Sequence, residues 1–160
     1  ATLAELNRVL GSDLRGMFIT MLYAVVDTVE HRVTFARAGH ELPLFSRRNQ
    51  LTGVPEGSYV GGEGMPLGMV PDELFTSVIM DCTEPFVTGD NLVLYTDGIT
   101  EAPNEEGKEF SGTRLADTVR TLHGRSAKDL NDGILENVHR FSGAALQRDD
   151  LTLVAVKCTA

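Results

Sequence analysis

Two apolar stretches next to aspartates decide the predicted fold: LVLYTDG at residues 92–98 and DDLTLVAV at residues 149–156. Short apolar runs bounded by turn residues are typical of buried strands, so we predict a strand in each stretch. If the two strands pair antiparallel, the end of the first lies beside the start of the second. Asp97 and Asp149 are then expected to meet at one end of the sheet.

The remaining patterns predict an α+β fold of antiparallel sheets with helices on the outside. Apolar residues at helical spacing predict helices over residues 2–10, around 115–122 and from Ser126 to a stop at Gly143. Further strands are predicted over residues 17–26, 33–38, 42–45 and 76–81. We expect the first of these to be buried on both faces because both alternating sets of its side chains are apolar. Residues 47–75 are predicted to be a long loop with one short strand near Tyr59.

The composition excludes several classes of protein. The chain has 160 residues, a net charge of −9 and no basic cluster larger than Arg47-Arg48. Nucleic-acid binding is therefore not expected, because such proteins usually have a basic face. No apolar run is long enough to span a membrane, and no secretory leader is expected. Cys82 and Cys158 form no zinc or disulfide pattern, which favours a cytoplasmic protein.

The two acidic positions have the chemistry of a metal site. Carboxylate oxygens without histidine or cysteine suit the hard cations Mg²⁺ and Mn²⁺. Gly98 lets the chain turn sharply beside Asp97. A different interpretation stays open, because Asp-Gly after a strand is a common turn and Asp149-Asp150 also fits a capped loop before a strand.

Other polar residues give weaker signals. His40, which follows Gly39 at a strand end, is positioned to touch a phosphate or a metal-bound water, whereas a mid-strand threonine such as Thr20 more often serves sheet packing than catalysis. The remaining histidines are expected on the solvated surface: His31, His123 and His139. The same is expected of the acidic run, with recruitment of cations as its alternative role: Glu101, Glu105, Glu106 and Glu109.

Several ordered motifs resemble the SpoIIE/RsbU-like branch of the PPM metal-dependent serine/threonine phosphatases. They are Met17-Phe18-Ile19-Thr20, Ala38-Gly39-His40 with Pro43-Leu44, Met65-Pro66-Leu67-Gly68, Leu94 to Ala102 (LYTDGITEA), and Asp149-Asp150-Leu151-Thr152. Their order and spacing match along the whole chain, and the LYTDGITEA stretch is highly specific. The resemblance implies a PPM-type β-sandwich of antiparallel sheets flanked by helices.

The resemblance also implies a function. Asp97 and Asp149 correspond to ligands of a centre with two Mn²⁺ or Mg²⁺ ions, and Asp150 corresponds to a neighbour that supports the loop. A metal-activated water is expected to hydrolyse phosphoserine or phosphothreonine directly. The implied substrate is a phosphorylated STAS-type anti-anti-sigma protein, and a sensor or receiver domain is expected upstream. Gly98, Gly39, His40 and Thr20 are expected near this site.

The chain departs from the family pattern in two respects. The family's early Asp-Gly motif, whose aspartate bridges both metals, has no counterpart here, so residues 1–160 are expected to be a single PPM-type domain without its N-terminal portion. The open strand edges then favour a dimer. Arg37 stands where the family tends to have asparagine. Two further hypotheses stay open: an inactive phosphatase-like module that binds a partner without turnover, and a nucleotide- or ion-binding domain of another class.

Overall fold

The computed structural model describes residues 2–11 and 13–159. The chain forms two compact units, each made of two segments of the sequence. The first unit contains residues 1–42 and 61–86, and the second contains residues 43–60 and 87–160. The prediction of a single domain over residues 1–160 stays a prediction.

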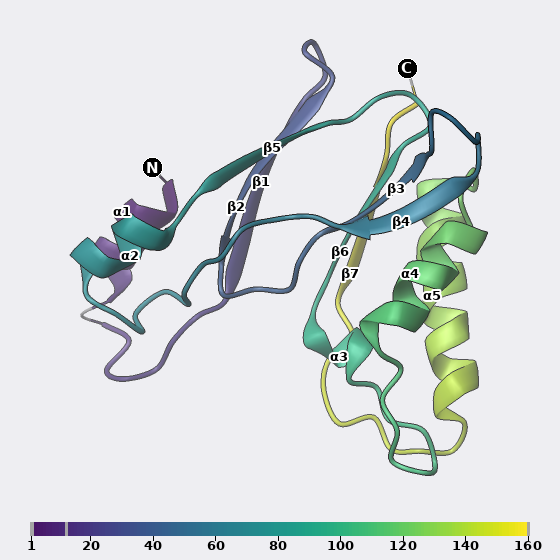
Figure 1. Cartoon of the computed structure of the whole chain (residues 1–160). Helices are drawn as coiled ribbons and strands as arrows, with labels where there is room; N and C mark the ends of the chain where they lie inside the picture. The colour runs from purple at the N-terminus through teal and green to yellow at the C-terminus, as the bar shows by residue number, and fades with distance from the viewer. Residues whose placement is uncertain (1, 12, 160) are drawn as a thin grey trace. The chain divides into compact units, whose positions relative to one another are not determined.

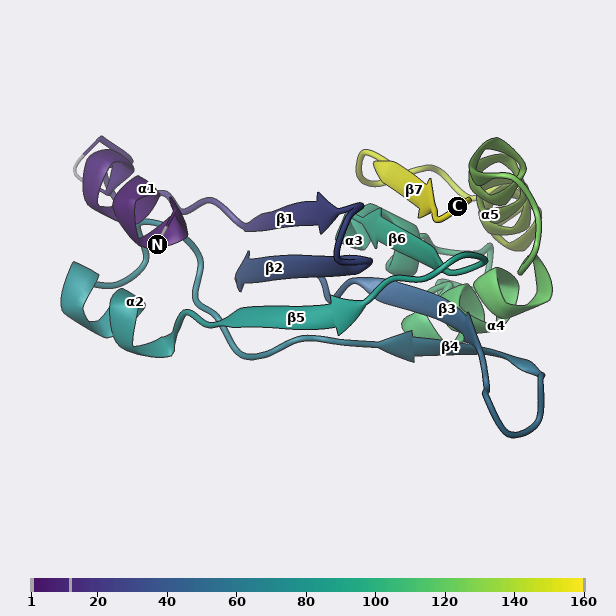
Figure 2. The same ribbon diagram turned by 90° about the horizontal axis from the view of Figure 1, so that it is seen from above.

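The elements of the first unit are α1 (Thr2–Leu10), β1 (Met21–Asp27), β2 (Arg32–Ala38), α2 (Asp72–Val78) and β5 (Asp81–Pro85). Those of the second unit are β3 (Leu44–Arg48), β4 (Pro55–Tyr59), β6 (Asn91–Tyr95), α3 (Asp97–Thr100), α4 (Gly112–Thr121), α5 (Ala127–Ser142) and β7 (Leu153–Lys157). The strands are ordered β1-β2-β5 in one sheet and β4-β3-β6-β7 in the other, and every pairing between them is antiparallel (Figures 1 and 2). The predicted α+β class with antiparallel sheets is confirmed.

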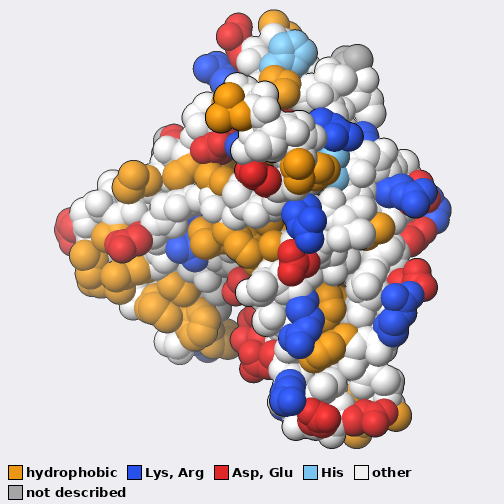
Figure 3. Space-filling view, turned by 45° about the vertical axis from the view of Figure 1, so that its right-hand side comes forward, with side chains coloured by type: hydrophobic (Ala, Val, Ile, Leu, Met, Phe, Trp, Pro, Cys, Tyr) orange, Lys and Arg blue, Asp and Glu red, His pale blue; other side chains and the backbone are white. Residues whose placement is uncertain are grey.

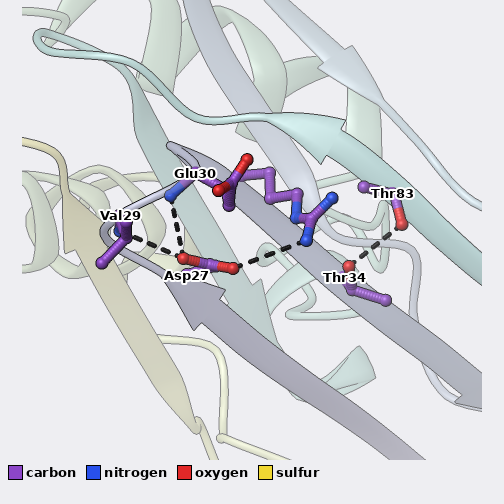
Figure 4. A network of polar contacts seen from close by, with 6 residues as sticks. Asp27, Val29, Glu30, Thr34 and Thr83 are labelled. Carbon is purple, nitrogen blue, oxygen red and sulfur yellow. Dashed lines mark hydrogen bonds and ion pairs between the residues drawn. The ribbon is translucent and has the colours of Figure 1, made fainter.

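The first unit begins its sheet with a tight β1–β2 hairpin. Asp27 ends β1, and its Oδ1 accepts hydrogen bonds from the backbone N–H groups of Val29 and Glu30 at 3.0 and 2.9 Å (Figure 4). These bonds lower the pKa of the Asp27 carboxyl, with the Glu30 amide contributing most. Farther along the sheet, the hydroxyls of Thr34 and Thr83 lie 3.0 Å apart across β2 and β5.

The two strands of this hairpin differ in burial. In β2, Val33 and Ala38 are fully buried, as is expected of a central strand. In β1, the side chains of Tyr23, Val25 and Val26 are 45%, 49% and 41% exposed. The prediction that the apolar run 17–26 is buried on both faces is therefore wrong. Apolar residues on both faces show what a strand is able to bury, whereas burial depends on which other segments cover it.

The second unit packs its sheet against α4 and α5, which lie side by side in Figure 1. Both helices have the apolar spacing that predicted them, and their inward side chains join the core of this unit. The Ser126 hydroxyl caps α5 by accepting from the backbone N–H of Asp129 at 3.1 Å, as the sequence pattern predicts. The buried cluster contains Leu44, Val93, Tyr95, Ile99, Ala102, Phe110, Leu115, Val119, Leu130, Ile134 and Val138.

Two further predictions are corrected. The strand predicted over residues 76–81 is wrong, because α2 occupies Asp72–Val78 and strand β5 begins only at Asp81. Helix α2 is held by Phe75, which is fully buried in a cluster with Leu3 and Leu67. The long loop is shorter than predicted because β3 extends to Arg48, and its predicted short strand is β4. In the part of the chain described, no helix has the length and apolar character needed to cross a bilayer.

Candidate metal centre

The predicted meeting of two strand ends is confirmed by the β6–β7 register. Tyr95 pairs with Leu153, and the backbone N–H of Thr96 then donates to the carbonyl of Thr152 at 3.1 Å. The Thr96 hydroxyl joins the two segments a second time. It donates to the Asp150 carbonyl at 3.2 Å and accepts from the Thr152 N–H at 3.1 Å. Thr96, which the sequence interpretation did not single out, therefore holds the residues after β6 beside those before β7.

Gly98 lets the two segments touch through their backbones. A Cβ atom at this position would lie 2.4 Å from the Asp150 carbonyl oxygen, closer than real Cβ contacts occur. Gly98 is buried, and its backbone belongs to the short helix α3. From the sequence, we expected only a sharp bend of the chain at this position. The Asp97 carbonyl starts this helix by accepting from the Glu101 N–H at 2.8 Å. The close approach explains the glycine without requiring a positive φ.

Asp97 and Asp149 therefore lie on adjacent segments at one end of the second unit's sheet, and both are exposed. The Asp149 carboxylate accepts the Asp150 N–H at 2.7 Å, which orders the approach to β7. An exposed pair of carboxylates has the oxygen chemistry that Mn²⁺ and Mg²⁺ prefer. Among residues 2–11 and 13–159, however, no three acidic, histidine or cysteine groups cluster closely enough to hold a metal. The ligand role of the two aspartates stays a prediction.

The near-site residues predicted in the first unit do lie together. The Thr20 hydroxyl is 3.3 Å from His40 Nδ1. Gly39 adopts a φ of +67°, and a Cβ there would lie 2.5 Å from Pro66. The unusual Arg37 donates to the His40 carbonyl at 2.7 Å and also to the Gly62 carbonyl, so it orders this turn. The near-site role of Thr20, Gly39 and His40 stays a prediction.

One predicted surface histidine is partly buried instead. His123 Nδ1 lies 2.9 Å from the hydroxyl of Ser46, which is fully buried, and 3.4 Å from the amide of Asn91. Burial lowers the pKa of His123, and the positive charges of Arg48 and Lys157 lower it further. The surface expectation is therefore wrong for His123. Its partners come from distant strands, so no local signal was available to predict them.

The acidic run after α3 divides into two pairs. Glu105 accepts the Ala144 N–H at 2.9 Å, and Glu106 forms an ion pair with Lys108 at 2.8 Å. Glu101 and Glu109 instead line a pocket of about 270 Å³, together with Gly98 and Asp149. All four glutamates are exposed, as predicted.

Charged side chains of both signs are mixed on the surface of the second unit (Figure 3), and the expectation of no nucleic-acid partner stays a prediction. Figure 3 shows Lys and Arg side chains interspersed with Asp and Glu over the helical part of the second unit. Several of these form ion pairs along a helix, such as Arg120 with Asp117 at 3.3 Å and Arg140 with Glu136 at 2.8 Å. The face in view has no continuous basic patch of the kind that binds a phosphate backbone.

Comparison with known proteins decides the family. The sequence model of Stage II sporulation protein E (SpoIIE) matches residues 1–159. The chain belongs to the SpoIIE family. The resemblance to the SpoIIE/RsbU-like branch of the PPM phosphatases that the motifs predicted is confirmed.

This SpoIIE-family chain is similar to longer proteins. It is 28% identical to the phosphoserine phosphatase RsbU of Bacillus subtilis over 156 residues, covering 97% of this chain and 44% of RsbU. It is 29% identical to protein IcfG of Synechocystis over 142 residues, covering 88% of this chain and 20% of IcfG. The chain thus spans less than half the length of these curated relatives.

A solved structure agrees with the fold of this SpoIIE-family chain. The phosphatase domain of SpoIIE from Bacillus subtilis, presoaked with Mn, matches with a TM-score of 0.70 at 19% identity. The match covers 98% of this chain and 65% of that one. At this identity the likeness concerns the fold alone, and it confirms the predicted PPM-type α+β fold.

Proposed function

We propose that this chain is part of a metal-dependent phosphatase domain that hydrolyses phosphoserine or phosphothreonine on a regulatory protein. The observation that supports the proposal is the backbone contact between Gly98 and Asp150 at the end of the β6–β7 pair. This contact brings the segments of Asp97 and Asp149 together although the two aspartates are far apart in the sequence. Membership of the SpoIIE family then supports a role for the two carboxylates in binding metal ions.

The proposed roles follow from the local geometry. Asp97 and Asp149 would each offer carboxylate oxygens to Mn²⁺ or Mg²⁺, while Thr96 and Gly98 keep the two segments in register. The bound ions would supply an activated water nucleophile and would neutralise charge on the phosphate oxygens. The remaining ligands are proposed to come from a region of the full-length protein that corresponds to the part of the solved SpoIIE domain outside the match, since the match covers 65% of that domain.

The proposal is tested by Mn²⁺-dependent hydrolysis of p-nitrophenyl phosphate and of a phosphoserine peptide by the full-length protein. Asp97→Asn and Asp149→Asn keep the side-chain size but remove a charge, and each is expected to lower kcat/KM by at least about 100-fold. Asp117→Asn is the control, because Asp117 is exposed on α4 and pairs with Arg120. Full activity of Asp97→Asn would remove that residue from the centre.

The alternative is a module that binds a phosphorylated partner without turnover. The finding in its favour is that the described residues contain no cluster of three metal-ligating groups. The same experiment separates the two proposals. Tight binding of the phosphopeptide by the full-length protein that does not depend on Mn²⁺ and releases no phosphate would support the module and contradict the enzyme.

The partners are proposed from the resemblance and the relatives. We propose a phosphorylated STAS-type anti-anti-sigma protein as substrate, supported by the similarity to phosphoserine phosphatase RsbU. An upstream sensor or receiver domain is proposed because both curated relatives extend well beyond the matched region. The cytoplasm is the proposed compartment, supported by the free thiols of Cys82 and Cys158.

We also propose that β1 pairs with a second copy of the chain. In the described part of the chain β1 is a terminal strand of its sheet, and apolar side chains on it are exposed, including Val25. Such an edge favours pairing with another strand. Light scattering after size exclusion is expected to show a dimer that Val25→Lys converts to a monomer. A monomer in the unsubstituted protein would contradict this proposal.

A further inference from the structure

The pocket beside Asp149 has a floor of apolar side chains. Val138 of α5 is 1% exposed and Ala102 is 7% exposed, and both belong to the core of the second unit. Leu151, which packs against the same core, and the buried Pro103 complete the floor. The pocket measures about 270 Å³, which is room for one long side chain rather than for a folded segment.

The rim of the pocket is mainly acidic. Glu101, Glu109 and Asp149 line it, against one basic residue, Arg148, and His139. Neither Glu101 nor Glu109 forms an ion pair within the part of the chain described, whereas Glu106 pairs with Lys108. Glu101 and Glu109 belong to no cluster of three metal-ligating groups among the residues described. Their positions at the rim favour a positively charged group that is attached to an apolar chain.

We propose that this pocket receives the side chain of a lysine or arginine that flanks the phosphorylated residue of the substrate. This inference rests on the proposed phosphatase function, because Asp149 and Gly98 belong both to the candidate metal centre and to the pocket wall. A lysine or arginine combines a methylene stem, which the apolar floor would cover, with a positive head for the rim. The pocket would thereby select substrates by sequence, while the metal centre recognises only the phosphate.

The test is a binding titration of the full-length protein with Mn²⁺ present and, as probes, peptides that carry a non-hydrolysable phosphoserine analogue. A single lysine is moved through the positions on either side of the phosphoserine, and each peptide is matched by one with uncharged norleucine. At one position the lysine peptide is expected to bind about fivefold more tightly, a factor appropriate for partly exposed charge pairs. No lysine preference at any position, or no binding by any peptide, would overturn the proposal.

Variants localise the effect. Glu101→Gln with Glu109→Gln is expected to abolish the lysine preference, whereas Glu136→Gln, which alters an exposed pair on α5, is expected to keep it. Ala145→Leu narrows the pocket without changing charge and is expected to weaken lysine and norleucine peptides alike. A lysine preference that persists in the double variant would overturn the assignment to this pocket.

Unphosphorylated copies of the same peptides separate this inference from the proposed function. If the phosphate raises the affinity of the peptide and the lysine does not, the pocket proposal is overturned and the phosphatase proposal stays intact. If the lysine raises the affinity and the phosphate does not, the result supports the pocket proposal and counts against the phosphatase proposal. Both gains together support both proposals.

Discussion

Strand β1 of the first unit and the central strands of the second unit's sheet are similarly apolar in sequence, but their side chains are buried to very different extents. In the second unit, α4 and α5 pack against one face of the sheet, and strand side chains such as Leu44 of β3 and Val93 of β6 are fully buried. In the first unit, Val25 and Tyr23 of β1 remain close to half exposed. The difference shows that apolar strand composition does not by itself determine burial, since burial requires a covering element.

The largest expected effect tests this difference directly. Leu115→Ala should lower the free energy of unfolding by about 2–5 kcal/mol, because it removes a fully buried side chain and leaves a cavity. Val25→Ala should cost less than about 1 kcal/mol, because its side chain is already partly in water. Urea denaturation of both variants measures the contrast. Equal costs would show that β1 is covered in solution.

The next effect concerns glycines in the two units. Gly98→Ala should cost about 1–3 kcal/mol, because the new methyl would collide with the Asp150 carbonyl and push the two segments apart. Gly62→Ala in the first unit is the control, since its Cβ would meet only Cys82 Sγ at an ordinary 3.7 Å. Calorimetry with Mn²⁺ should show weaker binding for Gly98→Ala alone. Unchanged stability and Mn²⁺ binding would contradict the close approach.

A smaller effect is expected for threonine hydroxyls. Thr96→Val should cost about 1 kcal/mol, because it removes the hydrogen bonds to Asp150 and Thr152, and Thr96→Ser should restore most of the loss. Thr34→Val in the first unit removes only an exposed hydroxyl contact with Thr83, so its cost should be smaller. Thermal unfolding of the three variants ranks them. A larger cost at Thr34 would reverse the comparison.

The smallest expected effect is a pH dependence that arises in the second unit. The pKa of His123 is lowered from 6.5, so the unfolded chain binds more protons than the folded chain just below this pH. Stability from this group should be fully present above pH 6.5 and should decline as the pH falls through the folded-state pKa. This pH dependence is measured by comparing the denaturation midpoints of the unsubstituted protein and of His123→Gln at pH values above and below 6.5. An identical slope in the variant would exclude His123 as the source.

Much of the fold was predictable because its signals are local. Helices α4 and α5 followed from apolar spacing and from the Ser126 cap, and strands β6 and β7 from short apolar runs. Helix α2 was missed because its sequence, DELFTSV, has no apolar periodicity and ends in residues that favour strands. Its conformation depends on Phe75, which is buried by residues distant in the chain.

The sequence by itself determined the family, the α+β class and the position of each aspartate at the end of an apolar strand. Only the tertiary structure decided that Gly98 lets the two aspartate segments touch, that Thr96 joins those segments, and that Glu101 and Glu109 line a shared pocket. The physical reason is that strand composition and helix capping act over a few neighbouring residues. Register, close backbone approach and pocket shape instead depend on contacts between residues that the chain separates widely.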